Sequence, residues 1–497
     1  MNPPLNAAID ADAAYASLLV RDARLDGHLF VGVTSTGVYC RPICRVRTPK
    51  RQNCRFFHTP AQAEAATFRP CLKCRPEIAP GPGLAWSVMD ASRTLARQAA
   101  HWLEAHAGDE ADAPAMVALA ARLGVSDRHL RRIFAAEHGV TPLQYLQTRR
   151  LLLAKQLLTD TAMPVAQVAL ASGFRSLRRF NAAFAANYRL SPSRLRRAAD
   201  AGPIDANEGV TIVLGFREPL DRAALMCFLA QRAIPGVEEV DGLRVRRTLR
   251  AGVVGEAAGW LEATFVADRS QLRVRYSNSL AASSGALLRA VRRWLDLDAD
   301  PQASDLALSG LPGNDGLRLP GSLDTFELAI RAVLGQQVTV AGARTLARRV
   351  VERFGEPIAT PWNALDLGFP SPVTLASAPI EQIARLGIIR TRAAAMTALA
   401  RDWPELLSLM GAPAAPAALI DRLCAVPGIG PWTAHYIAMR ALGWPDAFPP
   451  GDVAVLKALG LAKGRAGERE AEERSQAWRP WRAYAVLKLW NSLEKSA

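Results

Sequence analysis

Four cysteines fall within 35 residues of the chain, as Cys40-x-x-x-Cys44 followed by Cys71-x-x-Cys74. Two short-spaced pairs of this kind can each hold one edge of a tetrahedral Zn²⁺, with the four thiolates about 2.3 Å from the metal. The chain has seven cysteines in all, and an odd number in an arginine-rich chain favours metal binding over a disulfide framework. We therefore expect one zinc ion held by Cys40, Cys44, Cys71 and Cys74.

Basic residues crowd around these cysteines. They are Arg41, Arg45, Arg47, Lys50, Arg51, Arg55, Arg69, Lys73 and Arg75. A positive field lowers the pKa of a thiol and attracts phosphate. The chain carries a net charge of +15, and residues 1–200 supply +12 of it (27 Lys and Arg against 15 Asp and Glu), which leaves +3 for residues 201–497. The expected partner is therefore double-stranded DNA, and its attraction to the first 200 residues should be strongest.

A chain of 497 residues is long enough for several domains. We expect four modules: 1–80, 85–200, 205–310 and 311–497. Proline and glycine at 79–83 and 202–203 mark two boundaries, and a helical pattern that ends at 296–301 marks a less distinct third one. The second has helical periodicity, and the fourth is helical without a convincing strand. The third mixes short strands, at 210–216, 243–249, 259–267 and 271–276, with helices at 222–231 and 283–295. The expected fold class is multidomain α+β, with a small zinc domain first.

Neither a signal peptide nor an apolar span of about 18 residues is evident in the sequence. We expect a cytoplasmic protein with no membrane partner, associated with the bacterial nucleoid.

Two helix-turn-helix patterns occupy the second module. Residues 116–134 read as a helix, a glycine turn and a second helix capped by Ser126, and a second copy runs from Pro164 to Arg194. The pair resembles the AraC-type DNA-binding domain, in which a long helix, here 143–158, sets the two recognition helices about one DNA turn apart. The resemblance implies DNA-facing side chains at Arg128, Arg131, Arg132, Arg175, Ser176, Arg178 and Arg179. Any one of these arginines could instead simply solvate a surface, and which of them read bases stays open.

The fourth module contains a glycine hairpin. In Val426-Pro-Gly428-Ile-Gly430-Pro the two glycines allow a tight turn, whose backbone N–H groups can approach a DNA phosphate at the N-terminus of the next helix. Asp452 follows at the start of another helix. This order resembles the helix-hairpin-helix DNA glycosylase superfamily, and residues 335–338 and 484–490 resemble its AlkA-like members, the DNA-3-methyladenine glycosylases of type II.

That resemblance implies that Asp452 stabilises an oxocarbenium-like sugar while the N-glycosidic bond breaks. The alternative is a simple helix N-cap, which is the commoner role of an Asp before a helix. Strand-cleaving members carry a lysine nucleophile just after the hairpin, but this chain has Trp432 there, so hydrolysis without lyase activity is expected. An iron-sulfur cluster is excluded because Cys424 is the only cysteine after Cys227.

Three aromatic residues, Trp432, Tyr436 and Trp490, match positions that line the AlkA-type substrate pocket. Electron-rich rings prefer a cationic partner such as an N3- or N7-alkylated purine, although each ring could equally be part of the core. The lesion must be flipped out of the stack, and Gln337 is our candidate for the side chain that fills the gap. Residues 205–310 resemble the α+β module that precedes the AlkA core, which suggests support.

The cysteine region has a resemblance of its own. Residues 36–44, 53–57 and 68–74 are similar to the N-terminal domain of Ada-type alkylation-response proteins. This implies that Cys40 is both a ligand and the nucleophile that takes a methyl group from a DNA methylphosphotriester, with zinc keeping it a thiolate. Loss of one negative charge would then tighten DNA binding. DNA-facing positions are implied at Thr36, Arg47 and Arg69, and Cys54 is a spectator.

Together these resemblances predict an alkylation-damage response protein: a methyl-accepting transcriptional activator joined to a monofunctional glycosylase for alkylated purines. Alkylated DNA, promoter DNA and RNA polymerase are its expected partners. Repair of O6-alkylguanine is not expected, because no Pro-Cys-His-Arg motif is present. Two alternatives stay open: a regulator whose glycosylase module is catalytically silent, and a zinc ion that is purely structural.

Overall fold

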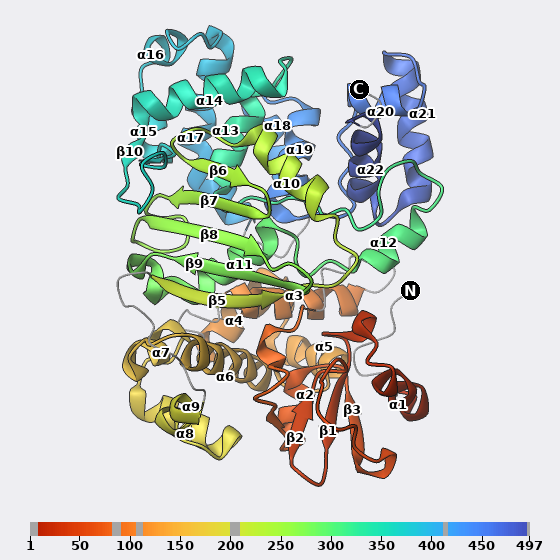
Figure 1. Ribbon diagram of the computed structural model, residues 1–497. Coiled ribbons are helices and arrows are strands. Elements are labelled where there is room, and N and C mark those ends of the chain that lie inside the picture. Colours follow the sequence, from red (N-terminus) through yellow and green to blue (C-terminus); the bar gives the residue numbers. More distant parts are fainter. Residues whose placement is uncertain (1–7, 82–90, 106–112, 199–208, 411–415, 495–497) are drawn as a thin grey trace. The chain divides into compact units, whose positions relative to one another are not determined.

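The computed structural model describes residues 8–81, 91–105, 113–198, 209–410 and 416–494. The chain forms two compact units, which are described separately: residues 1–218 with 268–289, and residues 219–267 with 290–497 (Figure 1). Of the break expected at 79–83, residues 82–83 lie outside the described residues, and so does the whole of the break expected at 202–203. The predicted fold class is confirmed, with a small cysteine-containing sheet, a helical module, an α+β module and a helical C-terminal module.

The first unit begins with a small sheet in the order β3-β1-β2-β4. Its elements are α1 (Ala11–Leu19), β1 (Phe30–Val33), β2 (Val38–Cys40), β3 (Cys54–Phe57), α2 (Pro60–Ala65) and β4 (Arg69–Pro70), with 3₁₀ turns at Ala23–Leu25, Arg51–Asn53 and η3 (Pro76–Ile78). Four aromatic residues, Phe30, Tyr39, Phe57 and Phe68, form the centre of a buried cluster here. A core this small needs additional cross-links to be stable, which the four cysteines can supply.

In the described residues from 91 to 198, seven helices follow. They are α3 (Ala91–Ala105), α4 (Ala113–Arg122), α5 (Asp127–His138), α6 (Pro142–Asp160), α7 (Val165–Ala171), α8 (Leu177–Tyr188) and α9 (Pro192–Ala198). The hydroxyls of Ser126 and Ser176 accept backbone N–H bonds at the starts of α5 and α8. Glycines 124 and 173 precede these helices with φ of +69° and +80°, as the turn of each helix-turn-helix pattern requires. Helix α6 matches the predicted connecting helix.

Within the first unit, Glu64 of α2 joins the small sheet to the helices. Its carboxylate accepts hydrogen bonds from the hydroxyls of Tyr39 (3.0 Å), Thr148 (3.0 Å) and Tyr188 (3.5 Å), which come from β2, α6 and α8. A second link is the buried ion pair between Lys155 of α6 and Glu77 of η3, at 2.6 Å. Both links place carboxyl groups of the cysteine-containing segment against α6.

The first unit also holds an antiparallel ladder of β5 (Val210–Gly215) and β9 (Gln271–Tyr276), followed by a 3₁₀ turn (Asn278–Ser283). Helix α11 (Ser284–Trp294) crosses the boundary between the units. In the second unit, α10 (Arg222–Arg232) precedes an antiparallel ladder of β6 (Glu238–Asp241), β7 (Arg244–Leu249) and β8 (Gly259–Phe265). All of these except β6 and the 3₁₀ turn were expected from the sequence.

Strand β6 was not predicted because its residues, Glu-Glu-Val-Asp, are mostly acidic. The register explains how it forms: Glu238 lies opposite Arg247, Glu239 opposite Arg246, and Asp241 opposite Arg244. Opposite charges on facing positions stabilise a strand pair. The formation of β6 therefore depends on its pairing with the arginines of β7.

The rest of the second unit is largely helical. Its helices are α12 (Pro301–Ala307), α13 (Thr325–Leu334), α14 (Val340–Phe354), α15 (Pro372–Ser377), α16 (Ile380–Ala384), α17 (Arg390–Met410), α18 (Pro416–Cys424), α19 (Pro431–Leu442), α20 (Val453–Ala458), α21 (Arg465–Ser475) and α22 (Arg482–Glu494), with a 3₁₀ turn at Gln476–Trp478. A two-residue ladder of β10 (Glu356–Pro357) and β11 (Leu367–Gly368) departs from the expectation that this module has no strand. Among the described residues, no helix combines the length and the apolar character needed to span a membrane.

Glu64 gives a prediction about pH. Burial raises the pKa of its carboxyl group to about 8, and the three hydroxyl donors only partly offset this. The folded chain therefore keeps a proton that the unfolded chain loses near its ordinary value of 4.5, so stability falls as pH rises from about 4.5 to about 8. Glu64→Gln should remove this fall. Since 1 kcal/mol shifts Tm by about 2–4 °C in a unit of this size, we expect the loss in Tm between pH 5 and pH 9 to shrink by at least about 3 °C. An equal loss in both proteins, measured by thermal melts, would contradict the prediction.

Candidate functional sites

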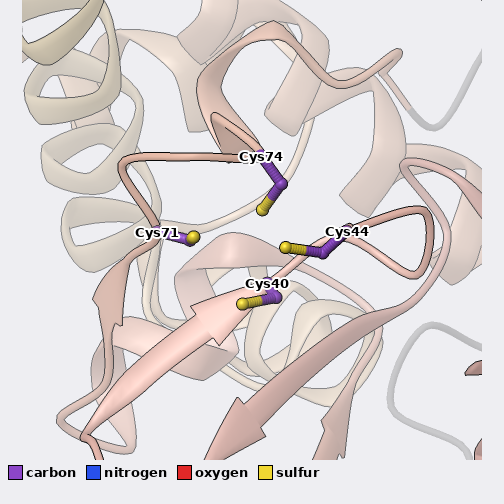
Figure 2. Close-up of side chains that lie close together, drawn as sticks. All are labelled: Cys40, Cys44, Cys71 and Cys74. Carbon is purple, nitrogen blue, oxygen red and sulfur yellow. The ribbon is translucent and has the colours of Figure 1, made fainter. Parts of the chain in front are cut away.

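The four predicted cysteine ligands lie together in the first unit. Their Sγ atoms are all within 4.8 Å of one another, and Figure 2 shows the four side chains converging on one point. A tetrahedral zinc site with bonds of about 2.3 Å has sulfur-to-sulfur edges of about 3.8 Å. Cys40, Cys44 and Cys71 are buried and Cys74 is half-buried. The thiols therefore fit one zinc ion after only small movements.

The sheet explains why distant cysteines meet. Strands β2 and β4 are parallel neighbours, with Tyr39 opposite Pro70, so Cys40 and Cys71 leave the two strands side by side. The backbone N–H of Cys71 donates to the Tyr39 carbonyl at 3.0 Å. Cys44 and Cys74 then follow at spacings of three and two residues, in turns that bring them back to the same point.

Arg41, next to Cys40, is buried at 5% exposure and holds the second cysteine pair in place. Its backbone N–H donates to the Cys74 sulfur at 3.4 Å, and its Nη1 donates to the Cys74 carbonyl at 3.2 Å. The guanidinium also forms a buried ion pair with Asp26. Positive charge and an N–H donor so close to a thiolate stabilise its negative form.

The DNA-facing residues predicted around the cysteines differ in exposure. Thr36, in the turn between β1 and β2, and Arg47, in the loop after Cys44, are exposed, whereas Arg69 on β4 is half-buried. Cys54 is buried on β3, and its thiol donates to the Lys50 carbonyl at 3.4 Å, away from the four-cysteine cluster.

The predicted DNA-facing side chains of the helical module lie at or near the starts of α5 and α8. Exposed positions are Arg128, Arg132, Arg175, Arg178 and Arg179. Arg131 is half-buried and forms an ion pair with Asp127 at 2.8 Å, and Ser176 is the α8 N-cap. The exposed guanidinium groups can reach phosphate or base edges.

In the second unit, the glycine hairpin connects α18 to α19. Gly428 has φ of +87°, and an added Cβ would lie 2.9 Å from the Ala395 side chain, so glycine is required there for two reasons. Gly430 is the N-cap of α19, and a Cβ added to it would meet nothing within 4 Å. Both glycines are exposed, so their backbone N–H groups are accessible to a phosphate.

Asp452 is buried at 7% exposure and accepts three hydrogen bonds. Its Oδ1 accepts from the backbone N–H of Val455 at 2.9 Å, which makes it the N-cap of α20. Its Oδ1 also accepts from the Trp490 indole N–H at 3.1 Å, and its Oδ2 accepts from the Trp432 indole N–H at 2.8 Å. The capping role that the sequence left as an alternative is therefore present together with a second set of contacts.

The three aromatic residues singled out in the sequence gather around this carboxylate. The rings of Trp432 and Tyr436 stack at 5.2 Å with an angle of 10°, and Tyr436 lies 6.4 Å from Trp490. All three are half-buried, whereas many core residues of this unit are fully buried. Trp432 and Trp490 donate hydrogen bonds to Asp452, and all three rings are partly exposed.

Gln337 lies in the turn between α13 and α14. It is exposed and has φ of +54°, a backbone conformation that non-glycine residues adopt rarely and at a cost. Its neighbour Gln336 holds the turn in place: the Gln336 amide donates to the Gly428 carbonyl at 3.0 Å and to the Thr433 hydroxyl at 3.1 Å. The hairpin and the turn that carries Gln337 therefore support each other.

Two residues that contact the hairpin and α19 were given no role from the sequence. Gln336 is one, although it lies within a recognised motif, and Arg440 of α19 is the other. Arg440 Nη1 donates to the Tyr436 hydroxyl at 2.7 Å. A spacing of four residues on a predicted helix was the only available signal, and it is too common to identify such a pair.

Comparison with known families accounts for most of the chain. Residues 13–77 match the metal binding domain of Ada, and residues 119–198 match a helix-turn-helix domain. Residues 211–324 match the AlkA N-terminal domain, and residues 330–483 match the HhH-GPD superfamily of base excision DNA repair proteins.

Similar whole proteins agree with these matches. DNA-3-methyladenine glycosylase 2 of Escherichia coli is 35% identical over 56% of this chain and 95% of its own length. The Escherichia coli bifunctional transcriptional activator/DNA repair enzyme Ada is 35% identical over 28% of this chain and 36% of its own. A probable bifunctional transcriptional activator/DNA repair enzyme AlkA of Mycobacterium tuberculosis is 36% identical over 98% of this chain and 97% of its own length. The chain belongs to this last family, the bifunctional transcriptional activator/DNA repair enzymes of the AlkA type.

Proposed function

We propose that the protein detects and repairs alkylated DNA by two separate reactions. Cys40 accepts a methyl group from a DNA methylphosphotriester, which turns on transcription through the helix-turn-helix module. The C-terminal module hydrolyses the N-glycosidic bond of alkylated purines of the 3-methyladenine class. The observation that supports the second reaction most directly is the buried Asp452 carboxylate between two indole N–H groups. DNA in the bacterial nucleoid and RNA polymerase would be its partners.

In base excision, the C1′–N bond breaks, the base leaves with the electron pair, and the sugar becomes positively charged. Asp452 Oδ1 already accepts two hydrogen bonds, whereas Oδ2 accepts only the one from Trp432. Because each carboxylate oxygen can accept about two, Oδ2 has capacity to spare. Oδ2 is therefore the atom that faces the developing charge and takes a proton from the attacking water.

The residues around Asp452 support hydrolysis without strand cleavage. Lyase chemistry needs an amine nucleophile, and the position after the hairpin holds Trp432, whose indole N–H donates a hydrogen bond to Asp452. Partly exposed Trp432, Tyr436 and Trp490 offer ring faces to a flipped cationic base, an interaction worth about 0.5–2 kcal/mol. The distorted DNA strand would be held at two places. The backbone N–H groups of Gly428 and Gly430 would bind a phosphate, and the Gln337 side chain would fill the gap that the flipped base leaves in the stack.

In methyl transfer, the Cys40 sulfur attacks the methyl carbon, a C–S bond forms, the C–O bond breaks, and the phosphate leaves as an ordinary diester anion. Zinc bound by the four cysteines would hold Cys40 as a thiolate at neutral pH. Thr36, Arg47 and Arg69 would hold the phosphate, and the arginines of α5 and α8 would bind promoter DNA. Methylation removes one negative charge facing DNA, so promoter affinity rises.

Asp452→Asn tests the excision reaction. Asparagine keeps the size and the acceptor oxygen but has no charge for the sugar, so release of 3-methyladenine from methylated duplex DNA should fall by about 10²–10⁴-fold. A matched control is Asp402→Asn, which alters a partly exposed carboxylate paired with Arg422 on the surface. Equal release by Asp452→Asn and wild type would contradict the role of Asp452, and no release by wild type would favour a regulator whose glycosylase module is silent.

Zinc binding is tested by metal analysis of the purified protein. Wild type should hold one zinc per chain, and Cys71→Ser should lose most of it, because three thiolates bind zinc far more weakly than four. Cys54→Ser, which removes a buried thiol outside the cluster, should keep it. Loss of zinc in both variants would point to general unfolding of the domain.

Mass spectrometry tests whether Cys40 reacts. After exposure to duplex DNA carrying methylphosphotriesters, wild type should gain one methyl group on the peptide that contains Cys40, and promoter affinity should rise about tenfold or more at moderate salt. Thr36→Ala should slow the transfer without loss of zinc. A protein that holds zinc but gains no methyl group would leave the cysteine cluster with a structural role only.

A further inference from the structure

Arg440 is a buried cation beside the proposed excision site. It lies on α19, ten residues beyond Gly430 of the hairpin, and is 8% exposed. Its Nε donates to the Pro320 carbonyl at 2.7 Å, its Nη2 to the Gly321 carbonyl at 3.1 Å, and its Nη1 to the Tyr436 hydroxyl at 2.7 Å. Each of the three guanidinium nitrogens thus has an acceptor.

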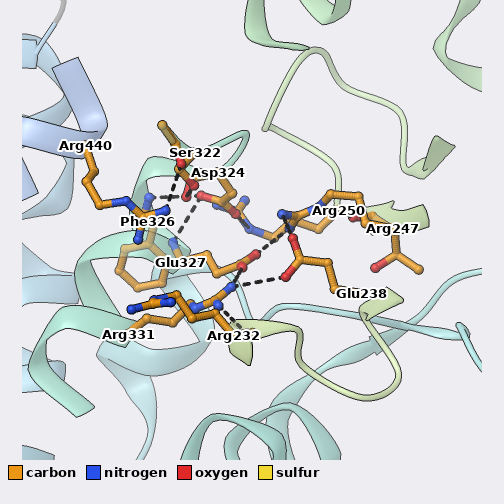
Figure 3. A network of polar contacts seen from close by, with 12 residues as sticks. Arg232, Glu238, Arg247, Arg250, Ser322, Asp324, Phe326, Glu327, Arg331 and Arg440 are labelled. Carbon is orange, nitrogen blue, oxygen red and sulfur yellow. Dashed lines mark hydrogen bonds and ion pairs between the residues drawn. The ribbon is translucent and has the colours of Figure 1, made fainter. Parts of the chain in front are cut away.

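The partners of Arg440 differ from those of several arginines near it, which are paired with carboxylates. Figure 3 shows Arg247 and Arg331 held by the carboxylates of Glu238 and Glu327, with Arg247 2.6 Å from Glu327. Arg250 likewise pairs with Asp324 at 2.8 Å. In the described part of the chain, the partners of Arg440 are two carbonyls, one phenol and the ring faces of Phe228 and Tyr436 at 4.9 and 5.5 Å, all neutral. Burying a cation without a carboxylate partner is costly, so such a residue is expected to have a specific use.

A short series of contacts leads from Arg440 to Asp452. The guanidinium holds the Tyr436 hydroxyl, the Tyr436 ring stacks on Trp432 at 5.2 Å, and the Trp432 indole N–H donates to Asp452 Oδ2 at 2.8 Å. Arg440, Tyr436 and Trp432 all lie on α19, so Arg440 tethers this helix and its rings to the Pro320–Gly321 segment.

We propose that Arg440 is a positioning residue of the excision site: it fixes the Tyr436 ring, and through the stacked Trp432 ring it fixes the indole N–H that holds Asp452. This role rests on the proposed glycosylase function. An indole that turns by a few tens of degrees loses its hydrogen bond to Oδ2, and small displacements of catalytic groups cost large factors in rate. Arg440 also acts on the phenol itself. Burial alone would raise the pKa of Tyr436. The charge and hydrogen bond of Arg440, together with the charges of Arg232 and Arg331, outweigh burial and leave the pKa of Tyr436 below its usual value.

A double-mutant cycle tests this role. The full chain is assayed for single-turnover release of 7-methylguanine from methylated duplex DNA, with wild type, Arg440→Met, Tyr436→Phe and the double variant. Each single change should slow the excision step by about 10-fold with little change in half-saturating protein concentration, because the lost contact positions a group rather than binding DNA. The double variant should be no more than about 2-fold slower than the slower single variant, since both changes break the same hydrogen bond.

If the rate of the double variant falls by the product of the two single-variant factors, the proposal is overturned. That result would mean that Arg440 acts through the Pro320 and Gly321 carbonyls and not through the phenol. A wild-type rate in Arg440→Met would overturn it as well. If that variant fails to fold in thermal melts, Arg440→Lys replaces it: an ammonium keeps the charge but cannot reach the phenol and both carbonyls together, so the rate should still fall.

The matched control is Arg474→Met, which removes an arginine paired with Glu470 on the surface of α21 and should leave the rate unchanged. Failure of the underlying function is recognised separately. If wild type releases no base, the glycosylase proposal itself fails, whereas an active wild type with an unaffected Arg440→Met removes only the role of Arg440.

Discussion

Burying a carboxylate is costly unless N–H groups surround it, and the proposed excision site is organised by this requirement at Asp452. Its three donors come from the start of α20, from α19 and from α22, so the carboxylate holds the ends of three helices in one arrangement. Each helix brings something of its own: α19 the hairpin and the stacked rings, α22 the third aromatic residue. An aliphatic side chain at this position would leave two indole N–H groups without their acceptor. The proposed chemistry and the packing of this module therefore depend on the same group.

In the first unit, the cysteine cluster also links stability to the proposed chemistry. A sheet whose strands are two to four residues long buries few side chains, and its aromatic core consists of Phe30, Tyr39, Phe57 and Phe68. One metal ion bound by four thiolates would cross-link β2, β4 and the turns that follow them, which is how small domains compensate for small cores. The same arrangement leaves Cys40 at the end of a strand, beside Arg41. In the proposed function, the groups that stabilise the domain also prepare the nucleophile.

Local patterns carried most of what the sequence predicted. Spacing identified the four cysteines, glycines at fixed offsets identified the hairpin and the helix-turn-helix turns, and alternation identified β5, β7, β8 and β9. What the sequence could not show depends on distant partners. Strand β6 forms because Glu238, Glu239 and Asp241 face arginines of β7, and Gln336 acts on Gly428, 92 residues away. Neither relation has a period or a motif that can be read along the chain.

The two proposed reactions place opposite demands on the residues that carry them. A thioether at Cys40 is not reversed by exchange with other thiols, so each molecule records one methylation event and the signal accumulates. Asp452 forms no lasting bond, so the excision site is regenerated after each base leaves. A reusable site depends on returning to the same geometry many times, which rewards a carboxylate fixed by three donors. A nucleophile that is used once needs only to be reactive once. Methylation can therefore remove one negative charge from the four thiolates permanently, because that loss of charge is the signal.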